Sequence, residues 1–283
     1  MMAMLAGSLF GAGAQGGVID DIARTGVLVA GTRADSPPFG FPDKEGHLVG
    51  FSVDILKEIA AAVSGSLHRP IRLVLRQTTP ETRTDMIRTR RIEIECGITT
   101  PTWARQQRTD FSIPFFVNGT RILTYRRFGD TVAALAGKKI GVVAGGTTRR
   151  VVLAAVPKAS IVEVPDMVRG MALFRAGKID ALSNLSVVLR GLLTSADDKG
   201  SLILLPRDGA LQYEPIACML PQDDSAWRSF VDHVIARDLQ GAPDYDGRYV
   251  EIYNKWFGPG AMLPMPLDHR VIRLLADAAY WID

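Results

Sequence analysis

The sequence predicts an α/β protein made of two successive α/β units. Short apolar runs alternate with amphipathic stretches from Gly26 onward, and the same alternation starts again after residues 135–137. At 283 residues, the chain divides more naturally into two units of ordinary domain size than into one large core. The repeated strand-helix-strand order predicts parallel strands, right-handed crossovers and helices on both faces of the sheet.

In the first unit, an apolar run at residues 27–30 predicts a buried strand that ends at Gly31. Ser52 is a suitable helix cap, and the apolar residues that follow it up to Val63 are spaced as on one face of a helix. The remaining expected elements are a strand at 71–76, a short helix at 84–89 and a strand at 92–96.

The second unit repeats this pattern. Its expected elements are a strand at 140–143, a helix at 148–155, a strand at 161–164, a helix at 167–176 and a strand around 181–182. Further strands are expected at 201–205 and 216–220, and a helix at 226–239. Units of this kind bind ligands outside the carboxyl ends of their strands, so the loops there are the expected functional sites.

Charge and hydropathy limit the partners and the location. The formal net charge is +3, and no block of Lys and Arg is interleaved with aromatic residues, so nucleic acid is not an expected partner. Residues 1–17 are apolar and rich in small residues, like the end of a secretory signal peptide with a cleavage site at 12–14; a disordered tail is the alternative. No later apolar run approaches the roughly twenty residues of a membrane span. Export without a membrane anchor is therefore expected.

The chain has two cysteines, Cys96 and Cys218. In an exported chain an even count permits one disulfide, while two buried free thiols are the alternative. Their long separation and the lack of nearby His or Cys argue against a metal site. We expect no metal and no cofactor.

Four segments carry a pattern of order and spacing over nearly the whole mature chain. They are residues 31–39 with 50–54, residues 95–100 with 105–107 and 110–112, residues 135–142 with 145–148, and residues 177–181. Together they resemble family 3 of the extracellular solute-binding proteins, which serve polar amino-acid ABC importers. Residues 95–97 and 119–124, with Cys218, are most similar to the glutamate/aspartate-binding branch of that family.

The resemblance implies a periplasmic-binding-protein-like fold, with two α/β lobes joined by two hinge strands. The hinges are expected at residues 116–118 and 214–216, which fall between the α/β units. Cys96 and Cys218 then both lie near the hinge side of lobe 1, which favours a disulfide. The expected boundaries are a signal-peptide remnant at 1–17, lobe 1 at 18–116 and 215–283, and lobe 2 at 117–214.

The resemblance assigns Arg105 to the α-carboxylate of the ligand, with Thr100 beside it. A guanidinium presents a planar fork that matches a carboxylate through two parallel hydrogen bonds. Residues 145–148 lie between a strand and a helix start, where unpaired backbone N–H groups and the helix dipole favour an anion near Thr147 and Thr148. A capping turn without a ligand is the alternative, and the missing Gly-Lys-Ser/Thr ending disfavours a nucleotide loop.

Arg33 and Arg83 match positions that the acidic-amino-acid branch uses to hold a side-chain carboxylate. A solvated surface charge is the alternative for each. Three buried arginines around one cleft need an anion between them, because unpaired buried charges are costly. Phe39 is expected to pack against the carbon skeleton of the ligand, unless it belongs to the core.

One position departs from the family pattern. Amino-acid binders of this family place an Asp near the end of the fourth segment to receive the α-ammonium, but this chain has Leu185 there. Ile98 and Met167 also replace polar residues that are expected beside the ligand. An apolar side chain cannot compensate a buried ammonium, which favours an organic mono- or dicarboxylate. Asn184 or its serine neighbours are the alternative, because neutral hydrogen bonds could still hold an amino acid.

These features favour a periplasmic, monomeric, substrate-binding component of an ABC importer that closes its lobes on a small anionic carboxylate ligand, an acidic amino acid or an organic acid. The expected partner is an ABC permease in the inner membrane. A ligand-sensing module for a membrane receptor would use the same pocket and is the alternative. A lyase on the same fold is less favoured, because the four histidines are scattered and a solvated strand face explains Glu93 and Glu95 more simply than an acid/base pair.

Overall fold

The computed structural model describes residues 16–193 and 200–277. Nearly all of the expected signal-peptide remnant, residues 1–15, lies outside the described residues, and that expectation stays a prediction. No helix in the described parts of the chain combines the length and the apolar character needed to cross a membrane.

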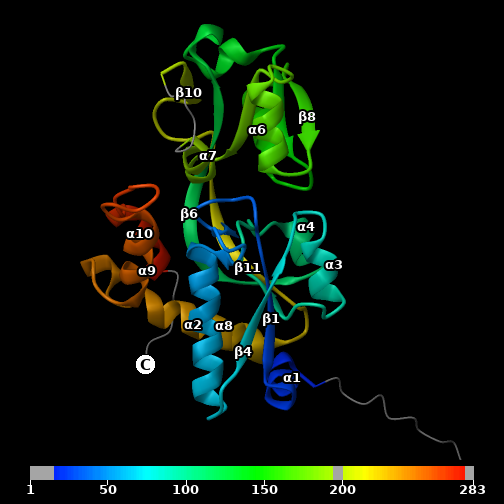
Figure 1. Cartoon of the computed structure of the whole chain (residues 1–283), viewed down its shortest axis with the longest axis vertical. Helices are drawn as coiled ribbons and strands as arrows, with labels where there is room; N and C mark the ends of the chain where they lie inside the picture. The colour runs from blue at the N-terminus through cyan, green and yellow to red at the C-terminus, as the bar shows by residue number, and fades with distance from the viewer. Residues whose placement is uncertain (1–15, 194–199, 278–283) are drawn as a thin grey trace, which may run out of the picture.

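The described residues form two lobes stacked along the long axis of the molecule (Figure 1). Lobe one, the lower lobe in that view, begins with α1 and holds the first α/β unit. Its elements, in chain order, are α1 (Val18–Thr25), β1 (Val27–Thr32), β2 (Phe41–Pro42), β3 (Leu48–Val49), α2 (Phe51–Ser66), β4 (Arg72–Gln77), α3 (Arg83–Arg88), β5 (Ile94–Glu95) and α4 (Trp103–Gln106).

Lobe two, the upper lobe, holds the second α/β unit. Its elements are the short 3-10 turns η1 (Arg126–Phe128) and η2 (Val132–Leu135), then β7 (Lys139–Val143), α5 (Thr148–Ala155), β8 (Ser160–Val164), α6 (Met167–Arg175), β9 (Ala181–Leu185), α7 (Ser186–Leu193) and β10 (Leu202–Leu205). The predicted positions of these strands and helices agree with the structure to within a few residues, because apolar periodicity identifies them directly.

Two long antiparallel strands, β6 (Asp110–Tyr125) and β11 (Gln212–Leu220), run between the lobes (Figure 1). Val117 faces Pro215 and Phe116 faces Ile216 in this pair, so the two expected hinges lie side by side. The parallel pairs β1–β4, β1–β5, β7–β8 and β7–β9 lie within single lobes. The strands follow the order β4-β1-β5-β11-β6-β9-β7-β8, and β10 pairs with β6.

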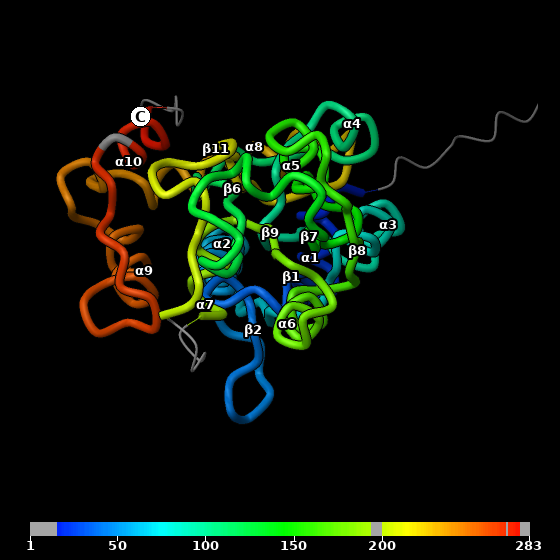
Figure 2. Tube along the Cα trace, turned by 90° about the horizontal axis from the view of Figure 1, so that it is seen from above, coloured from blue at the N-terminus to red at the C-terminus, as the bar shows by residue number. Residues whose placement is uncertain are grey.

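The C-terminal helices cover lobe one and the side of the connecting strands. They are α8 (Ser225–Leu239), the turn η3 (Ala242–Asp244), α9 (Arg248–Phe257) and α10 (His269–Asp277). Helices α9 and α10 lie on the opposite side of the molecule from α3 and α4, in both views (Figures 1 and 2). The loops that follow β1, β5 and β7 line a cavity between the lobes.

Cys96 and Cys218 form a disulfide, with their Cα atoms 4.3 Å apart. The cysteines follow and precede the paired residues Glu95 and Met219, so the bond joins the end of β5 to β11. Of the two alternatives that the sequence left open, the structure has the disulfide.

The start of α2 differs from the prediction. The N-cap is Gly50, with a φ of 141°, and Ser52 already lies inside the helix. A Cβ atom at Gly50 would lie 2.1 Å from the carbonyl oxygen of Phe39, so this close approach requires glycine. The Ser52 hydroxyl instead donates to the carbonyl of Gly97, 2.9 Å away, and ties α2 to the loop after β5.

Candidate ligand-binding site

A cavity lies between the two lobes, beside the connecting strand β11. Lobe one supplies residues from the loops after β1 and β5 and from α3 and α4, and lobe two supplies the loop after β7 and the end of β9. These are loops at the carboxyl ends of parallel strands, as expected for this kind of sheet. The lining residues are Arg33, Pro80, Arg83, Ile98, Thr100, Arg105, Val143, Gly146, Thr147, Thr148, Asn184, Leu185 and Glu214.

Seven of the eight site residues expected from the sequence line this cavity, and the eighth, Phe39, does not. Phe39 is fully buried in the core of lobe one. Its ring lies 6.0 Å from that of Phe51 and 5.0 Å from that of Phe116, in edge-to-face contacts. The geometry therefore fits the core alternative for Phe39.

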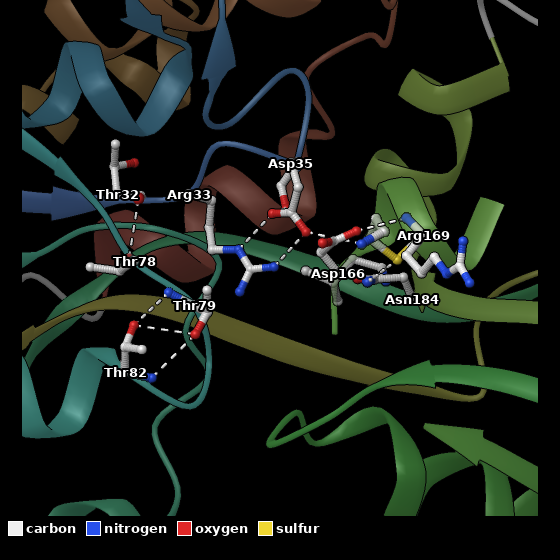
Figure 3. A network of polar contacts seen from close by, with 12 residues as sticks. Thr32, Arg33, Asp35, Thr78, Thr79, Thr82, Asp166, Arg169 and Asn184 are labelled. Carbon is white, nitrogen blue, oxygen red and sulfur yellow. Dashed lines mark hydrogen bonds and ion pairs between the residues drawn. The ribbon is translucent and has the colours of Figure 1, made fainter. Parts of the chain in front are cut away.

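Arg33 is 2% exposed and forms a two-bond ion pair with Asp35 (Figure 3). Its Nε and Nη2 atoms lie 2.8 and 2.7 Å from the two carboxylate oxygens. Burial raises the pKa of Asp35, but the charge and hydrogen bonds of Arg33, with the N–H of Met167, lower the net pKa below its ordinary value of 3.8. The sequence reasoning treated Arg33 as a free cation and missed the acid two residues away.

Asp35 also connects the lobes. Its Oδ2 atom accepts a hydrogen bond from the backbone N–H of Met167, the first residue of α6 in lobe two, at 3.0 Å. A carboxylate at this position is favoured because the first N–H groups of a helix lack partners within the helix. The loop after β1 therefore holds α6 against lobe one.

Arg83 is buried as well, at 3% exposed. Its Nη1 atom donates to the Thr99 hydroxyl at 2.5 Å, and that hydroxyl donates to Glu95 Oε2 at 2.7 Å. Burial, with repulsion from Arg105 and Arg33, outweighs the attraction of Glu95 and lowers the pKa of Arg83 to about 9. Arg83 is still charged at neutral pH, and an anion beside it would relieve this unfavourable environment.

Glu95 corrects the sequence interpretation of the strand that ends in Cys96. A solvated strand face was expected there, but Glu95 is fully buried. Its Oε1 atom would lie 2.3 Å from a Cβ atom at Gly97, so the glycine makes room for the carboxylate. Glu93 is half-buried and accepts from the backbone N–H of Val29 at 2.7 Å.

Arg105, in α4, spans the two lobes. Its Nη1 atom donates to the carbonyl of Thr100 at 2.6 Å, and its Nη2 atom donates to the carbonyl of Gly145 in lobe two at 3.0 Å. Burial lowers the pKa of Arg105, against the attraction of Glu95 and Glu214. A guanidinium has five N–H groups, so these two bonds leave donors for a carboxylate in the cavity.

The lobe-two loop reaches the cavity as expected. Gly145 and Gly146 follow β7, Thr147 is the N-cap of α5, and Thr148 is its first residue. The Thr147 hydroxyl donates to Glu214 Oε2 at 2.9 Å.

The structure places a carboxylate in the cavity that the sequence reasoning did not assign. Glu214, in β11, is 2% exposed. Its Oε2 atom accepts from Thr147 of lobe two and also from Thr100 of lobe one, at 3.2 Å. No acidic group that could hold an ammonium was expected from the sequence, because only position 185 was considered. Leu185 does line the cavity there. Glu214 could have been found from the sequence, because it is a charged residue inside the predicted hinge at 214–216.

The remaining lining residues from β9 are neutral. Asn184 is 6% exposed, with its Nδ2 atom 2.9 Å from the sulfur of Met167 and its Oδ1 atom accepting from the N–H of Leu185. Ile98 lines the lobe-one side of the cavity, and Met167 is fully buried and does not line it. The cavity therefore has a charged part, with three arginines and Glu214, and a neutral part, with Ile98, Asn184 and Leu185.

The two lobes, the paired connecting strands and the charged cavity between them define a solute-binding protein that encloses a small ligand. The family model of bacterial extracellular solute-binding proteins, family 3, matches residues 28–259. The chain belongs to this family. The match covers both lobes and every lining residue of the cavity.

Known proteins agree with this assignment. The glutamate/aspartate import solute-binding protein of Salmonella typhimurium is 30% identical over 257 residues, which cover 87% of this chain and 82% of the relative. A mutant of ArgBP from T. maritima superposes with a TM-score of 0.73 at 26% identity, over 85% of this chain and 99% of that one. An ancestral amino acid-binding protein, described as a precursor of cyclohexadienyl dehydratase, shares the fold with a TM-score of 0.70 at 24% identity, over 86% of this chain and all of that one.

Proposed function

We propose that this chain is the periplasmic solute-binding component of an ABC importer, and that it carries a small solute with at least one carboxylate, either an acidic amino acid or an organic acid. The observation that carries the proposal is the convergence of Arg33, Arg83 and Arg105 on one cavity between the lobes. The Nη1 atom of Arg33 and the Nε atom of Arg83 are buried and have no hydrogen-bond partner among the described residues. Such donors are costly to bury alone, and a carboxylate would satisfy them.

The name of the Salmonella typhimurium relative supports both the ligand class and the transport role. The partner is then an inner-membrane permease, and a monomer suffices, because one chain supplies both walls of the cavity. The boundaries proposed for the lobes are 18–116 with 215–283 for one and 117–214 for the other. The chain would bind and release its solute unchanged.

The mechanism is closure of the lobes about the middle of β6 and β11. An open form exposes the arginines of lobe one, and the solute occupies them first. On closure the solute gains contacts with Thr147 and Thr148 of lobe two. It therefore binds the closed form more tightly than the open form and shifts the population towards the closed form. A micromolar dissociation constant corresponds to about −8 kcal/mol, which a charge-assisted bidentate contact and several further hydrogen bonds can supply.

Calorimetric titration of the purified chain with L-glutamate, L-aspartate, glutarate and succinate tests the proposal. At least one of these should bind, and it should be recovered unchanged after the complex is denatured. Arg105→Ala should weaken binding by about 100-fold or more, since truncating one partner of a buried charge pair costs about 2–5 kcal/mol. The matched control is Arg108→Ala, because Arg108 lies close by and is half exposed, in a surface pair with Asp85. Unchanged affinity in the Arg105 variant would contradict the assignment.

A further inference from the structure

We infer that Glu214 binds the ammonium group of an α-amino acid, so that the solute is an amino acid and not an organic diacid. The inference rests on the proposed function and narrows its ligand class. Glu214 lies in β11, one of the strands that connect the lobes (Figure 1), and not in the loops that form most of the cavity lining. Its carboxylate nevertheless lines the cavity together with Arg83, Arg105 and Leu185.

The two oxygens of Glu214 have different surroundings. Oε2 accepts from the hydroxyls of Thr100 and Thr147. Oε1 is buried and has no hydrogen-bond partner among the described residues. A buried carboxylate oxygen without a donor is unfavourable, and an ammonium group brings three donors and the opposite charge.

The other acids near the cavity, Asp35 and Glu95, have hydrogen-bond partners at both carboxylate oxygens. Asp35 holds Arg33 in a two-bond ion pair, and Glu95 is linked to Arg83 through the Thr99 hydroxyl. Within the described parts of the chain, Glu214 has no Lys or Arg nitrogen at ion-pair distance, although Arg105 is near enough to attract it. Glu214 is therefore the acid that is left to pair with a cation from the ligand.

The unpaired atoms around the cavity form a complementary set. Arg33 Nη1 and Arg83 Nε are buried donors without an acceptor, and Glu214 Oε1 is a buried acceptor without a donor. A ligand with a carboxylate and an ammonium group satisfies both kinds. A diacid satisfies only the arginines, and it brings further negative charge close to the Glu214 carboxylate, where a low dielectric strengthens the repulsion.

A purely structural role for Glu214 is the competing explanation. Because Oε2 accepts from one threonine of each lobe, Glu214 also holds the lobes together. That role does not depend on the ligand and would change the affinity of every ligand by the same factor. A contact with the ammonium group changes only the affinity of ligands that carry one.

The experiment is a calorimetric comparison of matched ligands that differ only in the ammonium group: L-glutamate against glutarate, and L-aspartate against succinate. The wild-type chain should bind one of the amino acids at least tenfold more tightly than its diacid. Glu214→Gln keeps the size and the hydroxyl-accepting oxygen of the side chain but removes the charge. It should weaken binding of the amino acid by about 10- to 100-fold, as for a hydrogen bond to a charged group, and leave the diacid unchanged or tighter.

Glu163→Gln is the control variant, because Glu163 is half exposed in lobe two, in a surface pair with Arg149, and should change neither affinity. Equal losses for both ligands in Glu214→Gln would overturn the inference in favour of the structural role. A wild-type preference for the diacid would also overturn it and would leave the proposed function standing. If no carboxylate binds the wild-type chain, the proposed function itself fails. The wild-type preference is measured without any variant, so it decides between an amino acid and a diacid even if Glu214→Gln does not fold.

Discussion

The two lobes contribute different chemistry to the cavity between them. Lobe one supplies the charged groups, namely Arg33 with Asp35, Arg83 with Glu95, and Arg105. Lobe two supplies backbone groups, the hydroxyls of Thr147 and Thr148, an amide and aliphatic carbons. Both halves are α/β units with parallel strands, so the fold does not dictate this asymmetry.

The difference indicates that the two lobes have different roles in ligand binding. The Arg33–Asp35 ion pair and the hydrogen bonds that link Arg83 to Glu95 through Thr99 are held within lobe one, so they keep their geometry when the lobes separate. Lobe two contributes contacts that exist only when the lobes are together, such as the bonds Arg105–Gly145 and Asp35–Met167. Changes in lobe one should therefore affect the stability of the fold and the capture of the ligand. Changes in lobe two should affect closure alone.

The largest effect is expected from Arg83→Met. This change removes the cation and leaves Glu95 fully buried with hydroxyl partners only. The free energy of unfolding should fall by about 3 kcal/mol or more, because an uncompensated buried charge remains. Urea unfolding measures it, and the double variant Arg83→Met/Glu95→Gln should regain part of the loss. Arg149→Met, at an exposed position in lobe two, should change stability by no more than about 0.5 kcal/mol. No recovery in the double variant would argue against the coupling of Arg83 and Glu95.

A closure-specific effect is expected from Gly191→Ala in α7. A Cβ atom at Gly191 would lie 2.5 Å from the carbonyl oxygen of Pro37 in lobe one. Overpacking of this kind costs about 1–3 kcal/mol, so we expect roughly tenfold weaker binding, with an unchanged free energy of unfolding in the absence of ligand. Gly65→Ala in α2 is the control, since its Cβ would meet nothing within 4 Å. A parallel loss of stability in Gly191→Ala would show that the contact is not confined to the closed form.

A smaller effect is expected from Thr147→Val, which removes a hydroxyl from lobe two without changing the charge of the cavity. The hydrogen bond to Glu214 is lost, and the affinity should fall by about three- to tenfold, as for one ordinary hydrogen bond. Titration calorimetry measures the change, with Thr131→Val at an exposed position of lobe two as the control. A 100-fold loss would place Thr147 among the main ligand contacts and weaken the contrast between the lobes.

The smallest effect concerns pH. Because the net pKa of Asp35 is lowered below 3.8 in the folded chain, its ionised form stabilises the fold above that value. This contribution is lost as the pH falls through the folded pKa of Asp35. The difference in unfolding free energy between the wild type and Asp35→Asn should therefore be present at neutral pH and shrink as the pH falls below 3.8. A difference that is constant over this range would exclude the charge of Asp35 as its cause.

Much of the fold could be predicted because apolar periodicity reports burial directly. The helix at 148–155 and the strands at 140–143 and 161–164 follow from that pattern alone, and α5, β7 and β8 lie there. The cap of α2 could not be predicted in the same way. Gly50 is required by the carbonyl of Phe39, a neighbour that only the folded chain brings close.

The cavity shows the same limit. Arginines could be placed by their position in motifs, but the acids near Arg83 and Arg105 could not, since Glu95 and Glu214 come from a separate strand and from a connecting strand. Glu95 was interpreted as part of a solvated strand face, yet it is buried in the structure and accepts hydrogen bonds from Thr78 and Thr99. Whether a carboxylate is buried depends on contacts between distant segments, which a linear pattern does not contain.

The Cys96–Cys218 bond has a consequence for how the protein moves. Cys218 lies four residues beyond Glu214 on the same strand, about 13 Å of extended chain away. The disulfide therefore links the strand segment that carries Glu214 to lobe one. We expect the disulfide to keep Glu214 beside the arginines of lobe one when the lobes separate, so that only lobe two moves away from them. The groups that recognise both charged ends of the solute would then already lie together on lobe one before the lobes close.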